Sequence, residues 1–441
     1  MSSAMSSAPG LVIASPASGS GKTTVTLALL RAYRDAGVRV ASAKVGPDYI
    51  DAAFHAAASG RACRNLDPWA MRPDLLARLI DAAAQDADLL LVEGVMGLFD
   101  GAADGTGSSA DLAAFAGWPV VLVIDAAGQG ASAAALAKGF RDFRPEVEIA
   151  AVIANRVGGA GHQAILANAL ARLGMPLLGC FPREAGLALP ARHLGLVQAR
   201  EHQELEKFLM RAGEHAARHL DLAALARLAR PSRLSAPRGP LARLAPLGQR
   251  TAFACDDAFA FAYPHLLEDW RAQGAELLPF SPLADEPPAQ DADAVYLPGG
   301  YPELHAGRLA ANRRFIDGLR AAAARGAVVY GECGGYMVLG ERLRDAAGAS
   351  HLMAGLLPLE TSFLERHLHL GYRSLRLLAD GPLGAGGSAF RGHEFHYATV
   401  GREEAASPLF VATDARGHAL GTSGAVRGRV MGSFMHLVDR A

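Results

Sequence analysis

The sequence contains little cysteine and little lysine, and it has no long apolar run. Its 441 residues include four cysteines, whose spacing matches neither a zinc site nor a disulfide framework: Cys63, Cys180, Cys255 and Cys333. The lysines are equally few: Lys22, Lys44, Lys138 and Lys207. No apolar stretch approaches the roughly 18 residues of a membrane-spanning helix. We therefore expect a cytoplasmic protein that does not enter a membrane.

An excess of charge of either sign is also missing. The formal net charge is −1, so no broad basic face is available for nucleic acid. The N-terminal stretch MSSAMSSAPG carries neither the basic residues nor the apolar segment of a secretory signal. Nucleic acids and membranes are therefore not expected partners.

The length of the chain predicts more than one domain, because 441 residues exceed one ordinary hydrophobic core. In the first half, short apolar runs alternate with helical patterns, which is typical of a doubly wound parallel α/β sheet. The expected strands cover residues 11–15, 38–43, 88–93, 119–125, 149–155 and 177–181. A segment rich in proline, arginine and serine follows and is predicted to be a linker.

A second α/β pattern begins at Arg250. Its expected strands cover residues 251–255, 277–280, 294–297 and 327–330, and its expected helices cover 264–273, 312–325 and 335–340. The final segment is rich in strand patterns, at residues 369–377, 396–400 and 429–436. We therefore predict an N-terminal domain over residues 1–228, a linker over 229–249 and a C-terminal domain over 250–441.

The segment SPASGSGKTT lies between an expected strand and an expected helix at residues 15–24. A loop in this place turns backbone N–H groups toward an anion, and the helix N-terminus adds positive potential. Its lysine can reach the β- and γ-phosphates of a nucleotide. Asn155 ends a strand and is a candidate for reading the adenine edge, or is a simple turn residue. The expected ATP contacts are Ser18, Gly19, Ser20, Gly21, Lys22, Thr23, Thr24, Lys44 and Asn155.

A nucleotide site of this kind needs oxygen ligands for Mg²⁺. Glu93 ends the apolar strand ADLLLVE, at the sheet edge where ligands of such folds bind. Asp48 and Asp51 follow the strand that carries Lys44, although the same residues are common in caps and turns. The predicted Mg²⁺ ligands are Thr23, Asp48, Asp51 and Glu93.

The segment GECGG at residues 331–335 follows an apolar strand and precedes a helix. This order is typical of a nucleophile elbow, here with Cys333 as the nucleophile. We expect the start of the helix to lower the pKa of the thiol. The upstream segment LPGGYPE offers backbone donors for an oxyanion hole, formed by Gly300, Tyr301 and Gly334.

A thiol nucleophile needs a base that also returns the proton. His436 ends a strand near the C-terminus and is our choice for this base. His393 and His396, in the segment RGHEFHY, are the competing candidates.

Together these motifs resemble one known family. The whole chain is similar to the cobyrinate and hydrogenobyrinate a,c-diamide synthases. The strings that carry the resemblance are SGSGKTT, KVGPDYIDAAFH, NLDPW, VEGVMGLFDG, ANRVGG, PARHLGL, YLPGGYPELHA, GECGGYMVLG and RGHEFHY. The first half resembles the P-loop domain of dethiobiotin synthetase, and the second half resembles a class I glutamine amidotransferase domain.

The resemblance implies a carbon–nitrogen ligase of cobalamin biosynthesis with glutamine as amido donor. It implies that ATP activates the a and c acetate carboxylates of a corrin-type tetrapyrrole as acyl phosphates. Ammonia, released from glutamine at Cys333, then displaces phosphate. Candidate contacts to the acidic substrate lie in family-like strings, although charged residues are often only solvated: His55, Arg183, Arg192 and His193.

Two positions depart from the family pattern. Class I triads carry a glutamate two residues after the catalytic histidine, but Val438 stands there, so another group must orient His436 or the site works as a dyad. Pro16 replaces the first glycine of the strict phosphate loop. Open alternatives are a cobyric acid synthase, a nickel-sirohydrochlorin a,c-diamide synthase, and a P-loop switch ATPase with an inert second domain. The oligomeric state is also open, with a homodimer as one option.

Overall fold

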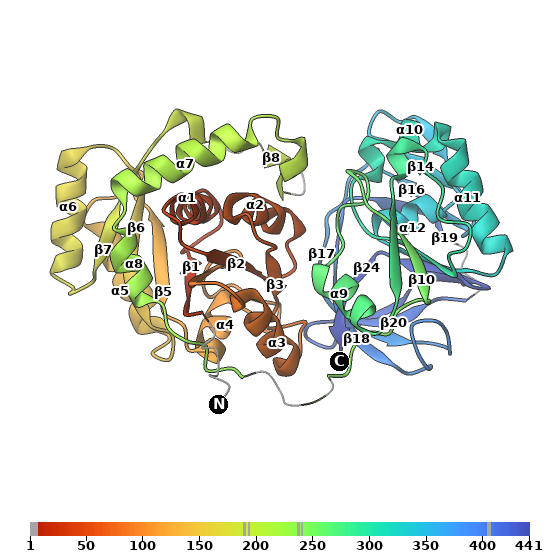
Figure 1. The fold of residues 1–441 in the computed structure, drawn as a ribbon, viewed down its shortest axis with the longest axis horizontal. Coiled ribbons are helices and arrows are strands. Elements are labelled where there is room, and N and C mark those ends of the chain that lie inside the picture. The colour runs from red at the N-terminus through yellow and green to blue at the C-terminus, as the bar shows by residue number, and fades with distance from the viewer. Residues whose placement is uncertain (1–7, 188–190, 193–194, 236–238, 240, 404–406) are drawn as a thin grey trace. The chain divides into compact units, whose positions relative to one another are not determined.

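The computed structural model describes residues 8–187, 191–192, 195–235, 239, 241–403 and 407–441. The chain divides into two compact units, shown in Figure 1. Unit 1 comprises residues 1–69 and 73–241, and unit 2 comprises residues 70–72 and 242–441. Both are α/β units, which confirms the predicted fold class.

Unit 1 contains a seven-stranded sheet in the order β3-β2-β4-β1-β5-β6-β7, in which all strands are parallel. Its strands are β1 (Gly10–Ala14), β2 (Val40–Val45), β3 (Arg64–Leu66), β4 (Leu89–Glu93), β5 (Val120–Asp125), β6 (Ile149–Val157) and β7 (Leu177–Pro182). The central strands are apolar and buried because helices cover both faces of a parallel sheet. A two-stranded ribbon adds β8 (Ala191–Arg192) and β9 (Gly195–Leu196).

The helices of unit 1 are α1 (Lys22–Asp35), α2 (Tyr49–Ser59), α3 (Pro73–Ala84), α4 (Ser109–Ala116), α5 (Ser132–Phe143), α6 (Ala160–Ala171), α7 (Leu205–His219) and α8 (Leu222–Leu228). Figure 1 shows α1, α2 and α7 on one face of the sheet, and α1 packs against both of the others. The loops after β1, β2 and β4 therefore meet at one edge of the sheet, around the start of α1.

Unit 2 has a six-stranded sheet in the order β11-β10-β12-β13-β23-β22, parallel except for β22. These strands are β10 (Arg250–Ala254), β11 (Glu276–Phe280), β12 (Ala294–Leu297), β13 (Val328–Glu332), β22 (Ala425–Arg427) and β23 (Val430–Ser433). The helices of the unit are α9 (Pro264–Ala272), α10 (Ala306–Ala311), α11 (Arg313–Ala324) and α12 (Gly334–Leu339).

Two antiparallel-rich sheets complete unit 2. A five-stranded sheet has the order β21-β20-β17-β18-β24, and a four-stranded sheet has the order β15-β14-β16-β19. Their strands are β14 (Arg342–Arg344), β15 (Ser350–Leu352), β16 (Leu359–Ser362), β17 (His369–Leu377), β18 (Ala389–His396), β19 (Thr399–Glu403), β20 (Phe410–Asp414), β21 (Ala419–Ser423) and β24 (Met435–Arg440).

The start of the segment predicted as a linker is hydrogen-bonded to unit 1. Arg230 pairs with Gly10 through two backbone hydrogen bonds of 2.7 and 3.0 Å, and the Arg233 N–H donates to the Ala116 carbonyl at 2.8 Å. The composition of this segment, rich in proline and arginine, did not predict the pairing, because backbone hydrogen bonds do not depend on residue type. The third predicted strand of the last segment, residues 429–436, is divided at Phe434 between β23 and β24.

Candidate functional site

The loop between β1 and α1 has the backbone of a phosphate-binding turn. Gly19 and Gly21 have φ of 79° and 85°, a left-handed conformation that favours glycine. The Ser20 hydroxyl donates to the Ala17 carbonyl at 2.8 Å and closes the turn. Lys22 is the first residue of α1. The predicted loop residues Ser18 to Thr24 are therefore brought together at the positive end of this helix.

The side chain of Asn155, at the end of β6, is hydrogen-bonded to this loop. Its Nδ2 donates to the Ser20 carbonyl at 2.8 Å, and a Cβ on Gly21 would lie 2.1 Å from the same nitrogen. The amide is thus engaged with the loop backbone in this structure. Its reading of an adenine edge stays a prediction.

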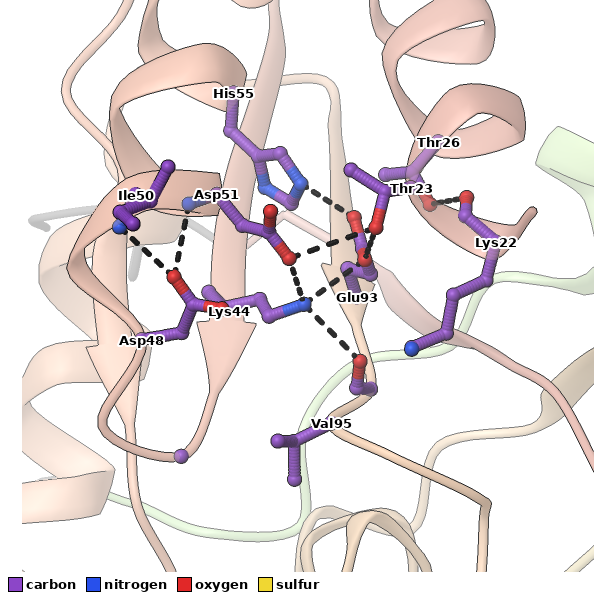
Figure 2. A network of polar contacts seen from close by, with 12 residues as sticks. Lys22, Thr23, Thr26, Lys44, Asp48, Ile50, Asp51, His55, Glu93 and Val95 are labelled. Atoms are coloured by element: carbon purple, nitrogen blue, oxygen red, sulfur yellow. Dashed lines mark hydrogen bonds and ion pairs between the residues drawn. The ribbon is translucent and has the colours of Figure 1, made fainter. Parts of the chain in front are cut away.

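Carboxylates from two elements, α2 and β4, converge on one ammonium group (Figure 2). Lys44 Nζ on β2 lies 2.6 Å from Asp51 Oδ2 on α2 and 2.9 Å from Glu93 Oε1 on β4. The Thr23 hydroxyl on α1 donates to Glu93 Oε1 at 2.6 Å. Lys44 and Glu93 are paired in register on adjacent parallel strands, which fixes their proximity. Three of the four predicted Mg²⁺ ligands, Thr23, Asp51 and Glu93, therefore lie in one cluster together with the predicted ATP contact Lys44.

The charges of this cluster are strongly coupled because it is buried. Burial opposes the charge on Lys44, but Asp51 and Glu93 outweigh it and raise the pKa of the ammonium. Burial would raise the pKa of Glu93, yet Lys44 and His55 hold it below its usual value. Lys22 differs, because burial and the neighbouring Lys44 lower its pKa. A phosphate group beside Lys22 would favour the charged form of its ammonium and so oppose the lowering of its pKa.

His55 was predicted to contact substrate, but its side chain is 0% exposed. His55 Nε2 lies 2.6 Å from Glu93 Oε2, and the pairing raises the pKa of the imidazole to about 10 against the effect of burial. His55 and Asp51 are four residues apart on α2 and so present side chains to the same face. This placement fits a role in holding Glu93.

Asp48 sits at the N-cap of α2 and accepts hydrogen bonds from the N–H groups of Ile50 and Asp51, at 2.8 and 2.9 Å. This is the capping role that the sequence left open as an alternative. Burial and the neighbouring Asp51 raise the pKa of Asp48 to about 6. Its role as a Mg²⁺ ligand stays a prediction.

Cys333 occupies a strained turn between β13 and α12. Its φ of 47° and ψ of −103° are unusual for a residue with a side chain. Its N–H donates to the Ser433 carbonyl at 2.8 Å, which ties the turn to β23. A Cβ on Gly335 would lie 2.0 Å from the Leu297 carbonyl, so only glycine fits behind the turn. The geometry is that of a nucleophile elbow.

The start of the helix favours the thiolate, as expected, but the net pKa of this thiol is nevertheless raised. Burial raises the pKa of Cys333, and the nearby carboxylate of Glu303 adds to the effect. The Gly334 N–H bonds to the sulfur and favours the thiolate, but this contribution is smaller. The thiol therefore needs a base to take its proton when it attacks.

His436 lies on β24, directly across from His393 on β18. Their rings stack with centroids 4.7 Å apart and planes 2° from parallel. A Cβ on Gly299 would lie 2.3 Å from His436 Cε1, so the ring is confined on a second side. Burial and His393 hold the pKa of His436 well below its usual value, so the imidazole is neutral and able to accept a proton.

Glu332 was missed by sequence reasoning, although it directly precedes the nucleophile. Its Oε2 lies 4.0 Å from His436 Nδ1. The hydroxyls of Tyr296 and Tyr330 donate to its carboxylate at 2.9 and 3.0 Å, and the Leu437 N–H donates at 3.2 Å. These donors offset the effect of burial only in part, and the pKa of Glu332 is raised to about 7. A carboxylate therefore lies near the histidine predicted as the base, even though Val438 stands at the usual triad position.

The predicted oxyanion residues are adjacent in space. A Cβ on Gly334 would lie 3.1 Å from the Gly300 nitrogen, so the two backbone segments approach closely. Tyr301 follows and is fully buried. Their assignment as donors to an oxyanion stays a prediction.

The structure gives less information on the other three residues predicted to contact the substrate. Arg183 is exposed at the end of β7. The backbone of Arg192 lies in β8, and His193 lies outside the described residues.

Every helix in the described part of the chain is too short or too polar to cross a membrane.

Two family models match the sequence. Residues 11–197 match the CobQ/CobB/MinD/ParA nucleotide binding domain, and residues 250–440 match the CobB/CobQ-like glutamine amidotransferase domain.

Curated relatives cover almost the whole chain. It is 57% identical over 432 residues to the hydrogenobyrinate a,c-diamide synthase of Brucella anthropi, with 98% of each chain covered. It is 55% identical to the protein of the same name from Rhizobium meliloti, covering 98% of this chain and 99% of that one. The Rhodobacter capsulatus protein of that name is 54% identical, with 98% and 100% covered.

Proposed function

Because the chain belongs to the family of hydrogenobyrinate a,c-diamide synthases, we propose that it amidates the a and c acetate carboxylates of a corrin-type tetrapyrrole acid, with ATP as activator and glutamine as amido donor. One observation carries this proposal. A single chain holds a phosphate loop with a cluster of oxygen ligands in unit 1, and in unit 2 both a cysteine elbow and a buried histidine whose pKa is held low. A switch ATPase has no use for the second site. We place the reaction in the cytoplasm, where ATP and glutamine are supplied.

The cluster in unit 1 fits Mg²⁺ by the chemistry of its donors. The Thr23 hydroxyl and the carboxylates of Asp51 and Glu93 are hard oxygen ligands; the two carboxylates already bind the cationic Lys44 Nζ, and the hydroxyl bonds to Glu93. These residues would hold the ion, which would offset charge on the nucleotide phosphates. His55 keeps Glu93 ionised and oriented.

In unit 1, the loop from Ser18 to Thr24 holds the phosphates of ATP through backbone N–H groups. Lys22 and Lys44 stabilise the charge that spreads over the γ-phosphoryl group as it moves to a substrate carboxylate. The product is an acyl phosphate. Ammonia then attacks the acyl carbon, the carboxamide forms, and inorganic phosphate leaves.

In unit 2, Cys333 Sγ attacks the side-chain amide carbon of glutamine while His436 takes the thiol proton. Gly300, Tyr301 and Gly334 surround the developing oxyanion. His436 then returns the proton to the leaving nitrogen, so ammonia departs and a thioester remains. Water hydrolyses the thioester to glutamate. Glu332 stabilises the imidazolium that forms in each step.

The substrate is tested by mass spectrometry of the products. The purified protein is incubated with ATP, Mg²⁺ and glutamine, and with either hydrogenobyrinic acid or cobyrinic acid. We expect two amides on at least one of these rings, and the ring used identifies the metal state of the substrate. Amides at other side chains of an a,c-diamide ring would instead identify a cobyric acid synthase. Amidation of only nickel-sirohydrochlorin would identify the third enzyme. ATP hydrolysis without any amidation would overturn the proposal.

A further inference from the structure

Arg373 on β17 and Glu394 on β18 form a close and largely buried ion pair. The Arg373 Nε and terminal nitrogen lie 2.9 and 2.7 Å from Glu394 Oε2. Their side chains are 12% and 13% exposed. A pair removed from water this far recovers little net stability, because desolvation of both charges opposes their attraction. Folding alone therefore does not account well for the pair.

The pair lies beside the reacting atoms of the glutaminase site. The carbonyl of Phe395, the residue after Glu394, is 3.8 Å from Cys333 Sγ. The charge of Glu394 acts on both the Cys333 thiol and the His436 imidazole. A ligand whose reacting carbon lies at the sulfur would thus meet a fixed cation and a fixed anion a short distance away.

Glutamine matches this arrangement. Its side-chain amide carbon is three bonds from its α-carbon, a span of roughly 4 Å for C–C bonds of about 1.5 Å. Its α-carboxylate and α-ammonium groups are a negative and a positive charge attached to the same carbon atom. A guanidinium binds a carboxylate through two hydrogen bonds, and a carboxylate accepts from an ammonium.

We propose that Arg373 binds the α-carboxylate of glutamine and that Glu394 binds its α-ammonium group, so that this pair selects free glutamine over other amides. The inference rests on the proposed glutaminase function of unit 2. His396 supports it, because its Nε2 lies 3.0 Å from Glu394 Oε1 and orients the oxygen that Arg373 does not hold. His396 is in turn stacked on Phe434, with centroids 4.0 Å apart.

A divalent cation is the rival ligand for this cluster. Ligand atoms of His369, Glu394 and His396 lie within 4.8 Å of one another, and His396 Nδ1 is buried without a hydrogen-bond partner in the described residues. The position of Arg373 favours glutamine, because its guanidinium already engages Glu394 and repels a metal ion at the same carboxylate.

The test measures ammonia release from glutamine and from two analogues that each lack one charge. Nα-Acetylglutamine lacks the ammonium group, and glutamine α-amide lacks the carboxylate. We expect wild type to prefer glutamine over either analogue by about 10- to 100-fold in kcat/KM, the range for one charge-assisted hydrogen bond. Glu394→Gln should raise the KM for glutamine by a similar factor and lose the preference over Nα-acetylglutamine. Arg373→Met should lose the preference over the α-amide.

Arg376→Met is the matched control, because Arg376 lies on the same strand, is exposed, and its guanidinium donates to the Gly387 carbonyl at 3.3 Å. It should keep both preferences. Arg373→Lys retains the charge and should keep part of the preference over the α-amide, which guards against a folding defect in Arg373→Met. Unchanged preferences in the Glu394 and Arg373 variants would overturn the inference.

Two further outcomes have distinct meanings. Calorimetry on Cys333→Ala, titrated with ZnCl₂ and then with glutamine, decides the rival ligand. Stoichiometric Zn²⁺ binding that glutamine does not displace, and that an added His369→Ala abolishes, makes the cluster a metal site and overturns the inference. If wild type releases no ammonia from glutamine while ammonium salts support amidation of the corrin acid, the glutaminase assignment fails, and the inference fails with it.

Discussion

His436 Nδ1 lies 4.0 Å from Glu332 Oε2, and Glu332 is the residue immediately before the nucleophile Cys333. The distance exceeds that of a hydrogen bond, so the contact in this structure is electrostatic. Two tyrosine hydroxyls and a backbone N–H fix the carboxylate in place. The proposed nucleophile and the carboxylate near its proposed base are therefore consecutive residues at the end of β13.

We predict that Glu332→Gln lowers glutamine-dependent kcat/KM by about 10- to 100-fold, which corresponds to roughly 1.4 to 2.8 kcal/mol at the transition state. The amide keeps the volume of the side chain but does not stabilise the imidazolium of His436. The measurement compares amidation driven by glutamine with amidation driven by ammonium salts. An equal loss with both nitrogen sources would contradict this role and point to a folding defect.

The pH profile of the glutamine-dependent reaction should reflect Glu332. Its pKa is raised to about 7, whereas burial holds the pKa of His436 well below its usual value and raises that of Cys333. The neighbouring Tyr296 and Tyr330 stay protonated because their pKa values are raised further. We expect kcat/KM to rise as pH increases through about 7, and we expect Glu332→Gln to lack this rise. A rise that persists in the variant would assign it to another group.

The same shift affects stability with the opposite sign. The pKa of Glu332 in the fold, about 7, exceeds the ordinary value of 4.5, so the folded state binds the proton more tightly. The stabilising contribution is present below pH 4.5 and is lost as pH rises toward 7. Denaturant unfolding of unit 2 across this range should show the decline in wild type and a flatter dependence in Glu332→Gln. A wild-type stability that increases across the range would contradict the assignment.

Gly299→Ala should disable the glutaminase site by displacing its base. The added Cβ would lie 2.3 Å from His436 Cε1, and His393 stacks against the same ring. We expect the glutamine-dependent rate to fall at least about tenfold, because general-base catalysis is typically worth 10²- to 10⁴-fold. Gly381→Ala is the control, since its Cβ would meet nothing within 4 Å. Equal rates in the two variants would show that His436 is free to move.

His55→Ala distinguishes a residue that holds Glu93 from one that contacts substrate. Removal of His55 leaves the buried Glu93 short of a partner, and loss of one member of a buried pair costs about 3 kcal/mol of folding stability. We expect a lower unfolding temperature and a raised KM for Mg·ATP. A raised KM for the corrin acid alone, with stability unchanged, would support the sequence-based assignment instead.

The sequence predicted much of this molecule because its motifs are local. The turn SGSGKTT and the elbow GECGG each combine a strand end, glycines and a helix start, and both structures follow these signals. Apolar runs such as LLLVE marked the buried parallel strands. Such features depend on residues that are neighbours in the sequence, so they can be predicted without knowledge of the fold.

The residues that sequence reasoning missed depend on contacts between distant segments. Glu332 approaches His436 across 104 positions because β13 pairs with β23, and β24 follows β23. The burial of Cys333, which reverses the expected direction of its pKa shift, is likewise set by the packing of unit 2. One local signal was available: His55 stands four residues after Asp51, on the same face of an expected helix.

The central claim is that this chain transfers nitrogen from glutamine to two carboxylates, and isotope labelling tests it most directly. The protein is incubated with ATP, Mg²⁺, hydrogenobyrinic acid and glutamine labelled with ¹⁵N at the side-chain amide, and the product is analysed by mass spectrometry. We predict two ¹⁵N atoms in the wild-type product. We predict none with Cys333→Ala and labelled glutamine, but two with Cys333→Ala and ¹⁵N-ammonium. Label incorporation from glutamine by Cys333→Ala, or a wild-type product without label, would contradict the account.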